Sequence, residues 1–362
     1  MKRRDFLAGA GAAAVTGCAG EQAGPTAGIA EARSYNWKLV TTWPPNFPGL
    51  GTGAAKLAEF IESASAGRLK IRVYAAGELV PAFEVFDTVS RGTAKMGHGA
   101  AYYWKGKSEA SQFFTTIPFG MTVLEMNGWL YHGGGLELYR ELYESFNLVP
   151  FPAGNTGVQM GGWFNKEINS LADLQGLKMR IPGLGGEVLK RAGGTPVNLP
   201  GAEIFTALQT GSIDATEWVG PYNDVAFGLH KAARFYYYPG WQEPGPVLEC
   251  IVNRDAWVSL PEDLKSIISI ACSAVNDQMT AEFTAFNARS LEQLENEADV
   301  EIRRFPADVL RELRAITDEL IEELASQDPM VARIRESFSS YKTAVAKWSA
   351  ISEQAMMQTR DL

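Results

Sequence analysis

One helix pattern occurs twice in this chain, and this repeat limits the possible folds more than any other feature. Residues 81–92 (PAFEVFDTVSRG) align without a gap with residues 200–211 (PGAEIFTALQTG), each matched pair lying 119 positions apart. Both segments place Pro in the first helical turn, Glu near the start, apolar residues on one face and Gly at the end. In a chain of 362 residues, long enough for two domains, the repeat predicts two similar α/β lobes.

Strands and helices alternate around the first copy of the pattern. Residues 37–43 form a predicted strand, and Leu69–Tyr74 form the next one. Between them, apolar residues recur at the spacing of an amphipathic helix: Leu50, Ala54, Leu57, Ala58 and Ile61. The opening of the body is therefore a β-α-β unit, which favours a parallel sheet.

Charge and cysteine content exclude several classes of protein. Lys and Arg number 33 against 42 Asp and Glu, for a net charge of -9. An acidic chain repels phosphate backbones, so we expect no nucleic-acid partner. The three cysteines, Cys18, Cys250 and Cys272, show no CxxC spacing, which argues against a zinc site or a disulfide framework. Pairing of Cys250 with Cys272 stays open.

The first 20 residues, MKRRDFLAGAGAAAVTGCAG, have the pattern of an export signal. Arg3 and Arg4 precede an apolar run of ten residues, which is shorter than the ~20 needed to span a bilayer. We therefore expect residues 1–33 to be a twin-arginine (Tat) signal and tether, and the mature protein to be periplasmic. Residues 15–18 resemble a lipobox, so two alternatives remain: a lipid anchor at Cys18, or cleavage beyond it.

Polar and aromatic residues follow the short strand predicted after each copy of the repeat. In open α/β sheets ligands bind beyond the carboxyl ends of strands, so residues 97–104 and 216–224 should face each other. Residues 154–159 and 178–183 join them with Asn155 and Arg180. An arginine fork binds a carboxylate with two donors, and an amide adds another. The alternative for Arg180 is an ion pair on the surface.

Oxygen-bearing side chains suggest a cation site as a second chemical theme. Gln159, Glu217 and Glu243, with nearby backbone carbonyls, would supply the hard oxygen ligands that sodium or calcium takes. The three histidines, His98, His132 and His230, show no metal-ligand spacing. Taken by themselves, these side chains favour ordinary solvated positions, because Glu and Gln usually lie in solvent.

Several long strings point to a known family. They are residues 41–49 (TTWPPNFPG), 96–104 (MGHGAAYYW), 154–159 (GNTGVQ), 177–183 (LKMRIPG) and 217–223 (EWVGPYN). With them, residues 33–260 resemble the extracytoplasmic solute receptors of tripartite ATP-independent periplasmic (TRAP) transporters, the DctP family. The resemblance is to the branch that binds 2-oxo acids and related monocarboxylates.

The resemblance implies a fold and a set of binding residues. The fold would be an α/β, two-lobed solute-binding protein of the Venus-flytrap type with a long helical C-terminal extension. Arg180 would pair with the ligand carboxylate. The full set implied for the ligand is Arg180, Asn155, Tyr102, Tyr103, Gln159, Trp218, Asn223 and Phe47. A bridging Na⁺ or Ca²⁺ would be held by Gln159, Glu217, the carbonyl of Trp218 and Glu243, with Gln242 as the alternative to Glu243.

The resemblance also implies a function and a domain layout. The protein would be a receptor and not an enzyme, without a catalytic cofactor. It would capture pyruvate or a longer 2-oxo monocarboxylate and deliver it to TRAP membrane subunits. Residues 34–153 would form mainly the first lobe, 154–254 mainly the second, and 255–328 helices across both. The helix over 329–362 would join two copies in a homodimer.

Two rival functions remain open at this point. The same receptor class could take lactate, mannitol or a haloaromatic acid. Alternatively, a Tat signal could export an oxidoreductase that carries a cofactor. Residues 49–54 do fit the GxGxxG/A pattern of a dinucleotide site, but Pro44, Pro45 and Pro48 interrupt the tight turn that such a site requires.

Overall fold

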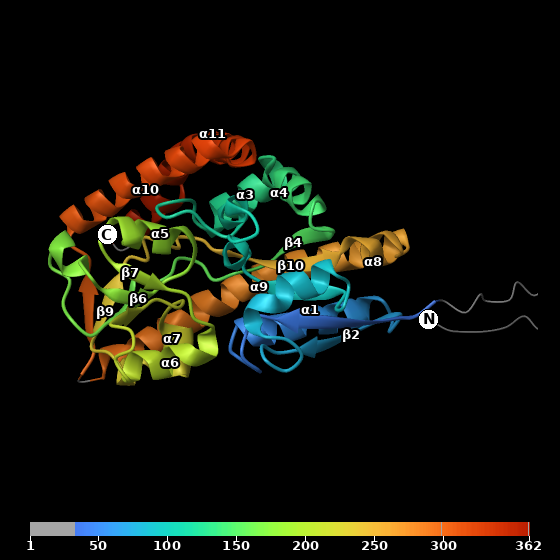
Figure 1. The fold of residues 1–362 in the computed structure, drawn as a ribbon, viewed down its shortest axis with the longest axis horizontal. Coiled ribbons are helices and arrows are strands. Elements are labelled where there is room, and N and C mark those ends of the chain that lie inside the picture. The colour runs from blue at the N-terminus through green and yellow to red at the C-terminus, as the bar shows by residue number, and fades with distance from the viewer. Residues whose placement is uncertain (1–32, 298, 361) are drawn as a thin grey trace, which may run out of the picture. The chain divides into compact units, whose positions relative to one another are not determined.

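Two β-sheets organise the computed structural model, which describes residues 33–297, 299–360 and 362. Residues Ser34–Leu362 form one compact unit (Figure 1). The predicted signal, lipobox and Cys18 lie outside the described residues. Among the described residues, no helix has the length and apolar character needed to span a bilayer.

The first sheet has the strand order β2-β1-β3-β10-β4. Strand β1 pairs in parallel with β2 and β3, whereas β10 runs antiparallel between β3 and β4. After β4 the chain leaves the first sheet, and it returns there only with β10. The strands are β1 (Tyr35–Thr41), β2 (Leu69–Tyr74), β3 (Met96–Gly99), β4 (Leu148–Asn155) and β10 (Val247–Asn253).

The second sheet has the order β11-β9-β5-β8-β6-β7. Parallel pairs join β6 to β7 and β8 and join β9 to β11, while β5 is antiparallel to both neighbours. The strands are β5 (Gly162–Phe164), β6 (Lys178–Arg180), β7 (Thr195–Val197), β8 (Ala215–Thr216), β9 (Phe235–Tyr238) and β11 (Glu301–Arg304).

The β-α-β unit predicted at the start of the body is confirmed. Helix α1 (Leu50–Ala64) connects β1 with β2, and the strand predicted at 37–43 begins two residues earlier. The helix buries the apolar face read from the sequence: Leu50, Ala54, Leu57, Ala58 and Ile61. Removal of this face from water holds the helix against the sheet.

The repeated helix pattern is confirmed in both places. Pro81 precedes η1 (Ala82–Glu84), which continues into α2 (Val85–Ser90), and Pro200 precedes α6 (Gly201–Gln209). Each helix is followed by a glycine with positive φ, 75° at Gly92 and 73° at Gly211, a conformation that favours glycine. The strands that come next, β3 and β8, lie in different sheets.

Short helices fill the connections between strands. They are η2 (Ala101–Trp104), η3 (Glu109–Phe114), α3 (Val123–His132), α4 (Gly135–Glu144), η4 (Leu171–Leu174), α5 (Gly183–Arg191), α7 (Pro221–Phe227), η5 (Leu229–Lys231) and α8 (Arg254–Val258).

Helix α9 (Glu262–Glu295) is 34 residues long and contacts elements from both halves of the unit. It packs on α1 and β4 and also on α7 (Figure 1). Met279 fills the space left by two glycines, since a Cβ atom at Gly53 or Gly154 would overlap its side chain. On β10 and α9, respectively, Cys250 and Cys272 are buried and free.

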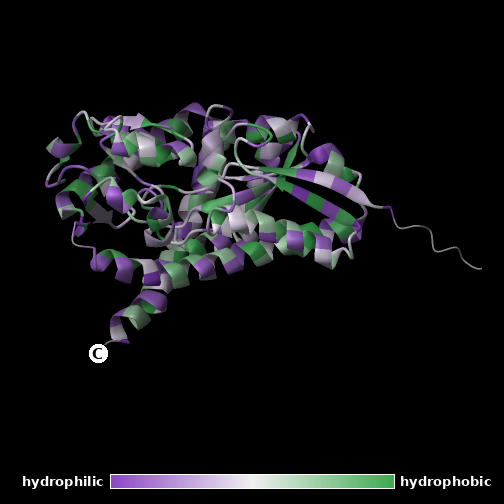
Figure 2. Cartoon of the chain, turned by 90° about the horizontal axis from the view of Figure 1, so that it is seen from below, coloured by the Kyte–Doolittle hydropathy of each residue, from purple (hydrophilic) through white to green (hydrophobic). Residues whose placement is uncertain are grey.

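The C-terminal region is helical, as predicted. Helix α10 (Ala307–Gln327) is followed by α11 (Pro329–Ile351) and α12 (Glu353–Thr359). Asp328 caps α11 by accepting hydrogen bonds from Met330 N and Val331 N. Helix α11 packs on α10, α3 and α4, but the end of the chain leaves the body of the unit (Figure 2).

Candidate functional site

Residues from both sheets surround one small cavity. It is lined by Trp43, Leu50, Tyr102, Tyr103, Thr156, Gln159, Trp218, Val219, Glu243 and Leu248. The loops after β1, β3, β4, β8 and β9 supply most of these residues. The free volume is about 10 Å³, at the lower limit for a single water molecule. A ligand can therefore enter only if side chains move or exchange partners.

Arg180 lies at the end of β6 and is 1% exposed. It forms an ion pair with Glu217, and its Nη2 donates to the Tyr103 hydroxyl at 3.4 Å. Its Nε donates to the carbonyl of Leu199 at 3.2 Å, and the guanidinium lies 5.1 Å from the ring of Trp218. The surface ion pair considered as an alternative is therefore wrong, because the side chain is removed from solvent.

The Arg180 guanidinium keeps its charge in this setting. Burial alone would lower its pKa, but the negative charge of Glu217 raises the pKa above its usual value. Burial raises the pKa of the Glu217 carboxyl to about 7, and the charge of Arg180 opposes that rise. Arg180 is therefore a buried cation, and it becomes available to a ligand carboxylate once Glu217 has another partner.

Three of the predicted cation ligands each have a buried side-chain oxygen that accepts no hydrogen bond. These oxygens are Gln159 Oε1, Glu217 Oε2 and Glu243 Oε2. Gln242 Oε1 is in the same condition. Buried polar atoms normally have partners, so these oxygens fit a hard cation such as sodium or calcium.

The two carboxylates of this set repel each other when both are ionised. Burial raises the pKa of Glu243 well above its usual value, and the charge of Glu217 adds to the rise. Among the described residues, no three His, Cys, Asp or Glu side chains come together to hold a metal ion. A cation site here would therefore rest on two carboxylates, the Gln159 amide and backbone oxygen.

The two tyrosines of η2 lie next to these groups. Tyr102 lines the cavity together with Glu243, and the hydroxyl of Tyr103 accepts a hydrogen bond from Arg180. Their rings meet edge to face with centroids 4.7 Å apart. Burial raises the pKa of both hydroxyls, so both stay protonated and can donate hydrogen bonds.

Five of the predicted site residues do not line the cavity itself: Arg180 and Glu217, which form the ion pair, and three others, Asn155, Asn223 and Phe47. Asn155 accepts from Gly157 N at 2.8 Å and donates to the carbonyl of Gly245 at 3.1 Å. Asn223 donates to the carbonyl of Pro48 at 3.0 Å. Phe47 packs on Trp218 and on Phe227, with centroids at 6.0 and 4.2 Å. In this structure these three residues hold the loops that form the site.

Several residues that line or support the cavity have no role predicted from the sequence. Trp43 and Thr156 lay inside the quoted strings but were not singled out, and Leu50 was interpreted only as part of a helix face. Val219 and Leu248 carry no chemical signal, because any apolar residue could form the same wall.

Asp224 supports the segment that carries Glu217 and Trp218. Its carboxylate accepts hydrogen bonds from Tyr236 Oη at 2.8 Å, Trp163 Nε1 at 3.0 Å and Val219 N at 3.3 Å. Burial raises its pKa to about 6, and these hydrogen bonds limit the rise. The side chain connects β5, β9 and the loop after β8 at one point.

His98 supports the opposite wall. Trp43 Nε1 donates to His98 Nδ1 at 2.7 Å, and because an indole only donates, Nδ1 must be an acceptor. His98 Nε2 therefore carries the proton and donates to the carbonyl of Ala153 at 3.0 Å. Burial lowers the pKa of His98 to about 4, so the ring is neutral.

Ala153 is an extra residue in β4. Leu248 pairs with Gly154 and Glu249 with Pro152, so Ala153 has no partner across the β10 ladder. Such a bulge leaves a carbonyl outside the ladder. His98 reaches across β10 from β3 to satisfy it.

The chain matches a family model and a closely similar protein over most of its length. The family model described as bacterial extracellular solute-binding protein, family 7 (DctP) matches residues 39–328. A monocarboxylate 2-oxoacid-binding periplasmic protein from Nostoc sp. is 42% identical over 357 residues, covering 98% of this chain and 97% of that protein.

Solved structures are similar over nearly their whole length. A TRAP periplasmic solute binding protein from Pseudoalteromonas atlantica, with bound sodium and pyruvate, is 46% identical with a TM-score of 0.88, covering 90% of this chain and 99% of that chain. A TRAP transporter solute binding protein from Bordetella bronchiseptica is described as a mixed-occupancy dimer with calcium and picolinate. It is 36% identical with a TM-score of 0.88, covering 90% of this chain and 97% of that chain.

Proposed function

This chain belongs to the DctP family of TRAP solute-binding proteins, and from that membership we propose that it is the receptor for a small 2-oxo monocarboxylate. It captures pyruvate or a longer 2-oxo acid together with Na⁺ or Ca²⁺ and presents the ligand to the membrane subunits of the transporter. We assign it no catalytic step and no catalytic cofactor.

The observation that carries the proposal is the buried Arg180–Glu217 pair beside oxygens that lack donors. A ligand carboxylate would pair with Arg180 through a planar contact with two donors. This contact is stronger where water is excluded. A cation would take Glu217, Glu243, Gln159 and the carbonyl of Trp218. Its charge would offset the repulsion between the two carboxylates.

The chemistry of the ligands in related structures favours a 2-oxo acid. Pyruvate and picolinate were found with sodium and calcium, respectively, in two similar proteins. Both molecules carry a carboxylate next to a second donor atom, a keto oxygen or a ring nitrogen, so both can chelate a cation. Mannitol has no carboxylate to engage the charge of Arg180.

Contacts between the two proposed lobes support a receptor that closes on its ligand. Segments 34–153 and 154–254 meet where Phe47 packs on Trp218, where Asn223 bonds the carbonyl of Pro48, and where Lys105 pairs with Glu187. Closure of this kind removes water from the Arg180 site. Opening would release the ligand.

The proposal also covers how the protein is exported and how it assembles. The N-terminal pattern supports export to the periplasm by the Tat route, with a lipid anchor at Cys18 as one of the two alternatives. A homodimer is supported by large exposed apolar side chains near the C-terminus: Trp348, Ile351, Met356 and Met357, each at least 60% exposed. A patch of this kind is usual at an interface.

Thermal unfolding of refolded, ligand-free protein tests the proposal. Pyruvate, lactate and mannitol would each be added with sodium, calcium or chelator. A ligand at a hundredfold excess over Kd raises the free energy of unfolding by about 2.7 kcal/mol. We expect pyruvate with a cation to stabilise the wild type and the surface control Arg311→Ala, but not Arg180→Ala. Stabilisation by mannitol alone would contradict the ligand class and the role of Arg180.

A further inference from the structure

The loop after β9 carries Glu243, one of the predicted cation ligands. Its backbone is bonded to the segment that carries Gln159, a second predicted ligand. Gly240 N donates to the carbonyl of Gln159 at 2.9 Å, and Gln159 N donates to the carbonyl of Glu243 at 3.1 Å. The position of this loop therefore affects two predicted cation ligands at once.

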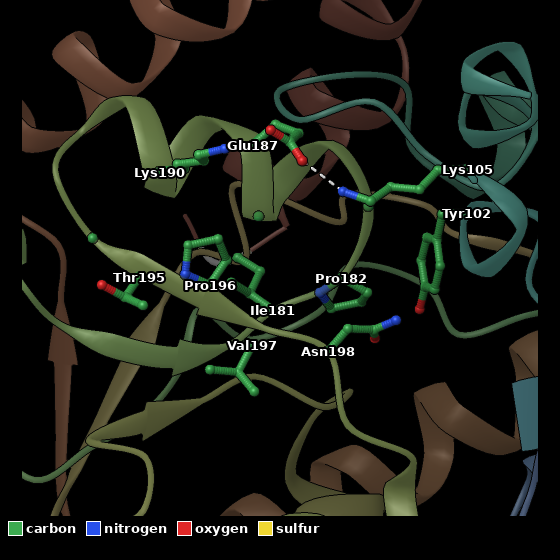
Figure 3. Close-up of a pocket in the computed structure, with 13 residues that line it drawn as sticks. Tyr102, Lys105, Ile181, Pro182, Glu187, Lys190, Thr195, Pro196, Val197 and Asn198 are labelled. Carbon is green, nitrogen blue, oxygen red and sulfur yellow. Dashed lines mark hydrogen bonds and ion pairs between the residues drawn. The ribbon is translucent and has the colours of Figure 1, made fainter.

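Helix α5, which carries Glu187 and Lys190 in Figure 3, packs on one side of this loop. A Cβ atom at Gly185 would lie 3.0 Å from the Cβ of Gln242, so helix and loop are in tight contact. Gln242 Nε2 also donates to the carbonyl of Met160 at 2.9 Å. Elements of the second sheet thus hold this side of the loop.

Phe119 holds the other side. Its backbone N donates to the carbonyl of Trp241 at 2.7 Å, and its ring stacks on the Trp241 ring with centroids 5.7 Å apart. Further along the loop, a Cβ atom at Gly245 would lie 2.6 Å from the backbone of Thr122. Phe119 and Thr122 therefore hold the chain before and after Glu243.

The backbone of Phe119 has a conformation that non-glycine residues rarely adopt, with φ at 56°. Such a conformation persists only where neighbouring groups fix it. Lys342 on α11 is one of these groups, because its Nζ donates to the carbonyl of Phe119 at 2.6 Å. Arg314 on α10 is another, with its guanidinium 5.8 Å from the Phe119 ring.

Lys342 is thus the first of three residues in contact that lead to the cation site. It bonds Phe119, Phe119 bonds Trp241, and Trp241 lies two positions before Glu243. Lys342 itself does not line the cavity. We propose that Lys342 is a positioning residue for the cation site, acting through Phe119 on the loop that carries Glu243. The inference rests on the proposed binding of a cation with the ligand.

Isothermal titration with sodium, and separately with calcium, at saturating pyruvate tests the inference. Lys342→Met keeps an unbranched side chain and loses the donor. We expect affinity for the cation to fall about fivefold to tenfold, as when other supports behind metal ligands are removed. The direction is informative, because loss of a positive charge by itself would favour cation binding. Lys342→Arg keeps a donor and should restore most of the affinity.

Lys95→Met is the matched control. Lys95 Nζ also donates to a backbone carbonyl, that of Gly92 at 2.9 Å, but neither residue lines the cavity. This variant loses the same charge and the same kind of hydrogen bond, so it should lower stability and leave cation affinity unchanged.

Phe119→Ala tests the route of the effect. It removes the ring from Trp241 and should also weaken cation binding. If Lys342 acts through Phe119, the loss in the double variant is smaller than the product of the two single losses.

Two results would overturn the inference: wild-type cation affinity in Lys342→Met, or equal losses in Lys342→Met and Lys95→Met. Losses that multiply fully in the double variant would also overturn it, because Lys342 would then act independently of Phe119. A wild type that binds neither cation beside pyruvate is a different outcome. The proposed function then fails, and the inference fails with it.

Discussion

The buried guanidinium of Arg180 forms its ion pair with Glu217, and Glu217 still has one oxygen without a donor. Each residue can take a second partner of opposite charge: a ligand carboxylate for Arg180 and a cation for Glu217. Binding would then exchange one internal pair for two external ones, without leaving a buried charge alone. This explains why an anion and a cation should bind together.

Loss of the Glu217 charge should therefore separate the two events. We expect Glu217→Gln to lower the affinity for the cation by about tenfold or more, because the number of charged ligands sets cation affinity. Pyruvate binding should then become nearly independent of sodium. Tryptophan fluorescence during sodium titration at fixed pyruvate measures this. The exposed Glu203→Gln should behave as wild type; unchanged sodium dependence in Glu217→Gln would exclude Glu217 as a ligand.

Asp224 should affect the affinity for the cation through the loop after β8, which it holds in place. In Asp224→Asn the amide group must face a donor, Trp163 Nε1 or Val219 N, so we expect a loss of about 1 to 3 kcal/mol in the free energy of unfolding. The sodium affinity should fall as well. Tyr237→Phe, which loses a hydrogen bond from Ile168 N in the same sheet, should lower stability only. Equal sodium affinities would reduce Asp224 to a structural role.

Glu249 should make stability depend on pH in the ligand-free protein. Burial raises its pKa to about 7, opposed by hydrogen bonds from Tyr139 and Trp104. A raised carboxyl pKa means that the folded state holds the proton more tightly, so its stabilisation is complete below about pH 4.5 and lost as pH rises through 7. From pH 5 to 8 the wild type should lose about 2 to 3 kcal/mol relative to Glu249→Gln.

Urea unfolding at several pH values measures that difference. Comparison with the variant matters, because His98, with its pKa lowered to about 4, contributes the opposite slope below pH 6.5. The exposed Glu137→Gln on α4 is the matched control and should stay parallel to the wild type. A Glu249→Gln curve parallel to the wild type would show that the carboxyl titrates normally.

The exposed C-terminal side chains should matter for assembly and little for folding. We expect Trp348→Glu with Ile351→Glu to convert a dimer into a monomer at micromolar concentration, because both side chains are at least 65% exposed and charges oppose apolar association. Sedimentation velocity measures the change, and the unfolding temperature should stay within a few degrees. Val258→Glu, exposed on α8, is the control. A wild type that is monomeric would contradict the homodimer.

Local signals predicted much of the fold. The strand Leu69–Tyr74 has the predicted bounds, and α11 begins at Pro329, where the C-terminal helix was predicted to start. Each depends on nearby residues: alternation within a strand, or a proline that ends one helix and opens the next. The return of β10 to the first sheet had no such signal, since strand pairing over a hundred residues leaves no pattern in either segment.

The residues of the site were predicted better than the ion pairs and hydrogen bonds between them. The side chains of Arg180, Gln159, Glu217 and Glu243 come together because the ends of strands from both halves meet there. The direct pairing of Arg180 with Glu217 was not predicted, because the sequence suggested a separate partner for each. Asp224 and His98 were missed as supports because a buried carboxylate or imidazole looks like any other polar residue in a sequence.

The hydrogen bond from His98 to Ala153 has a consequence for related sequences. The extra residue in β4 exposes a carbonyl that no strand neighbour can satisfy, and His98 is its donor. A relative that has lost the histidine should therefore also lack the inserted residue, or supply another buried donor, since an unpaired carbonyl costs about 1 to 3 kcal/mol. The histidine and the insertion should be gained and lost together, which makes the pair a marker of shared descent within the family.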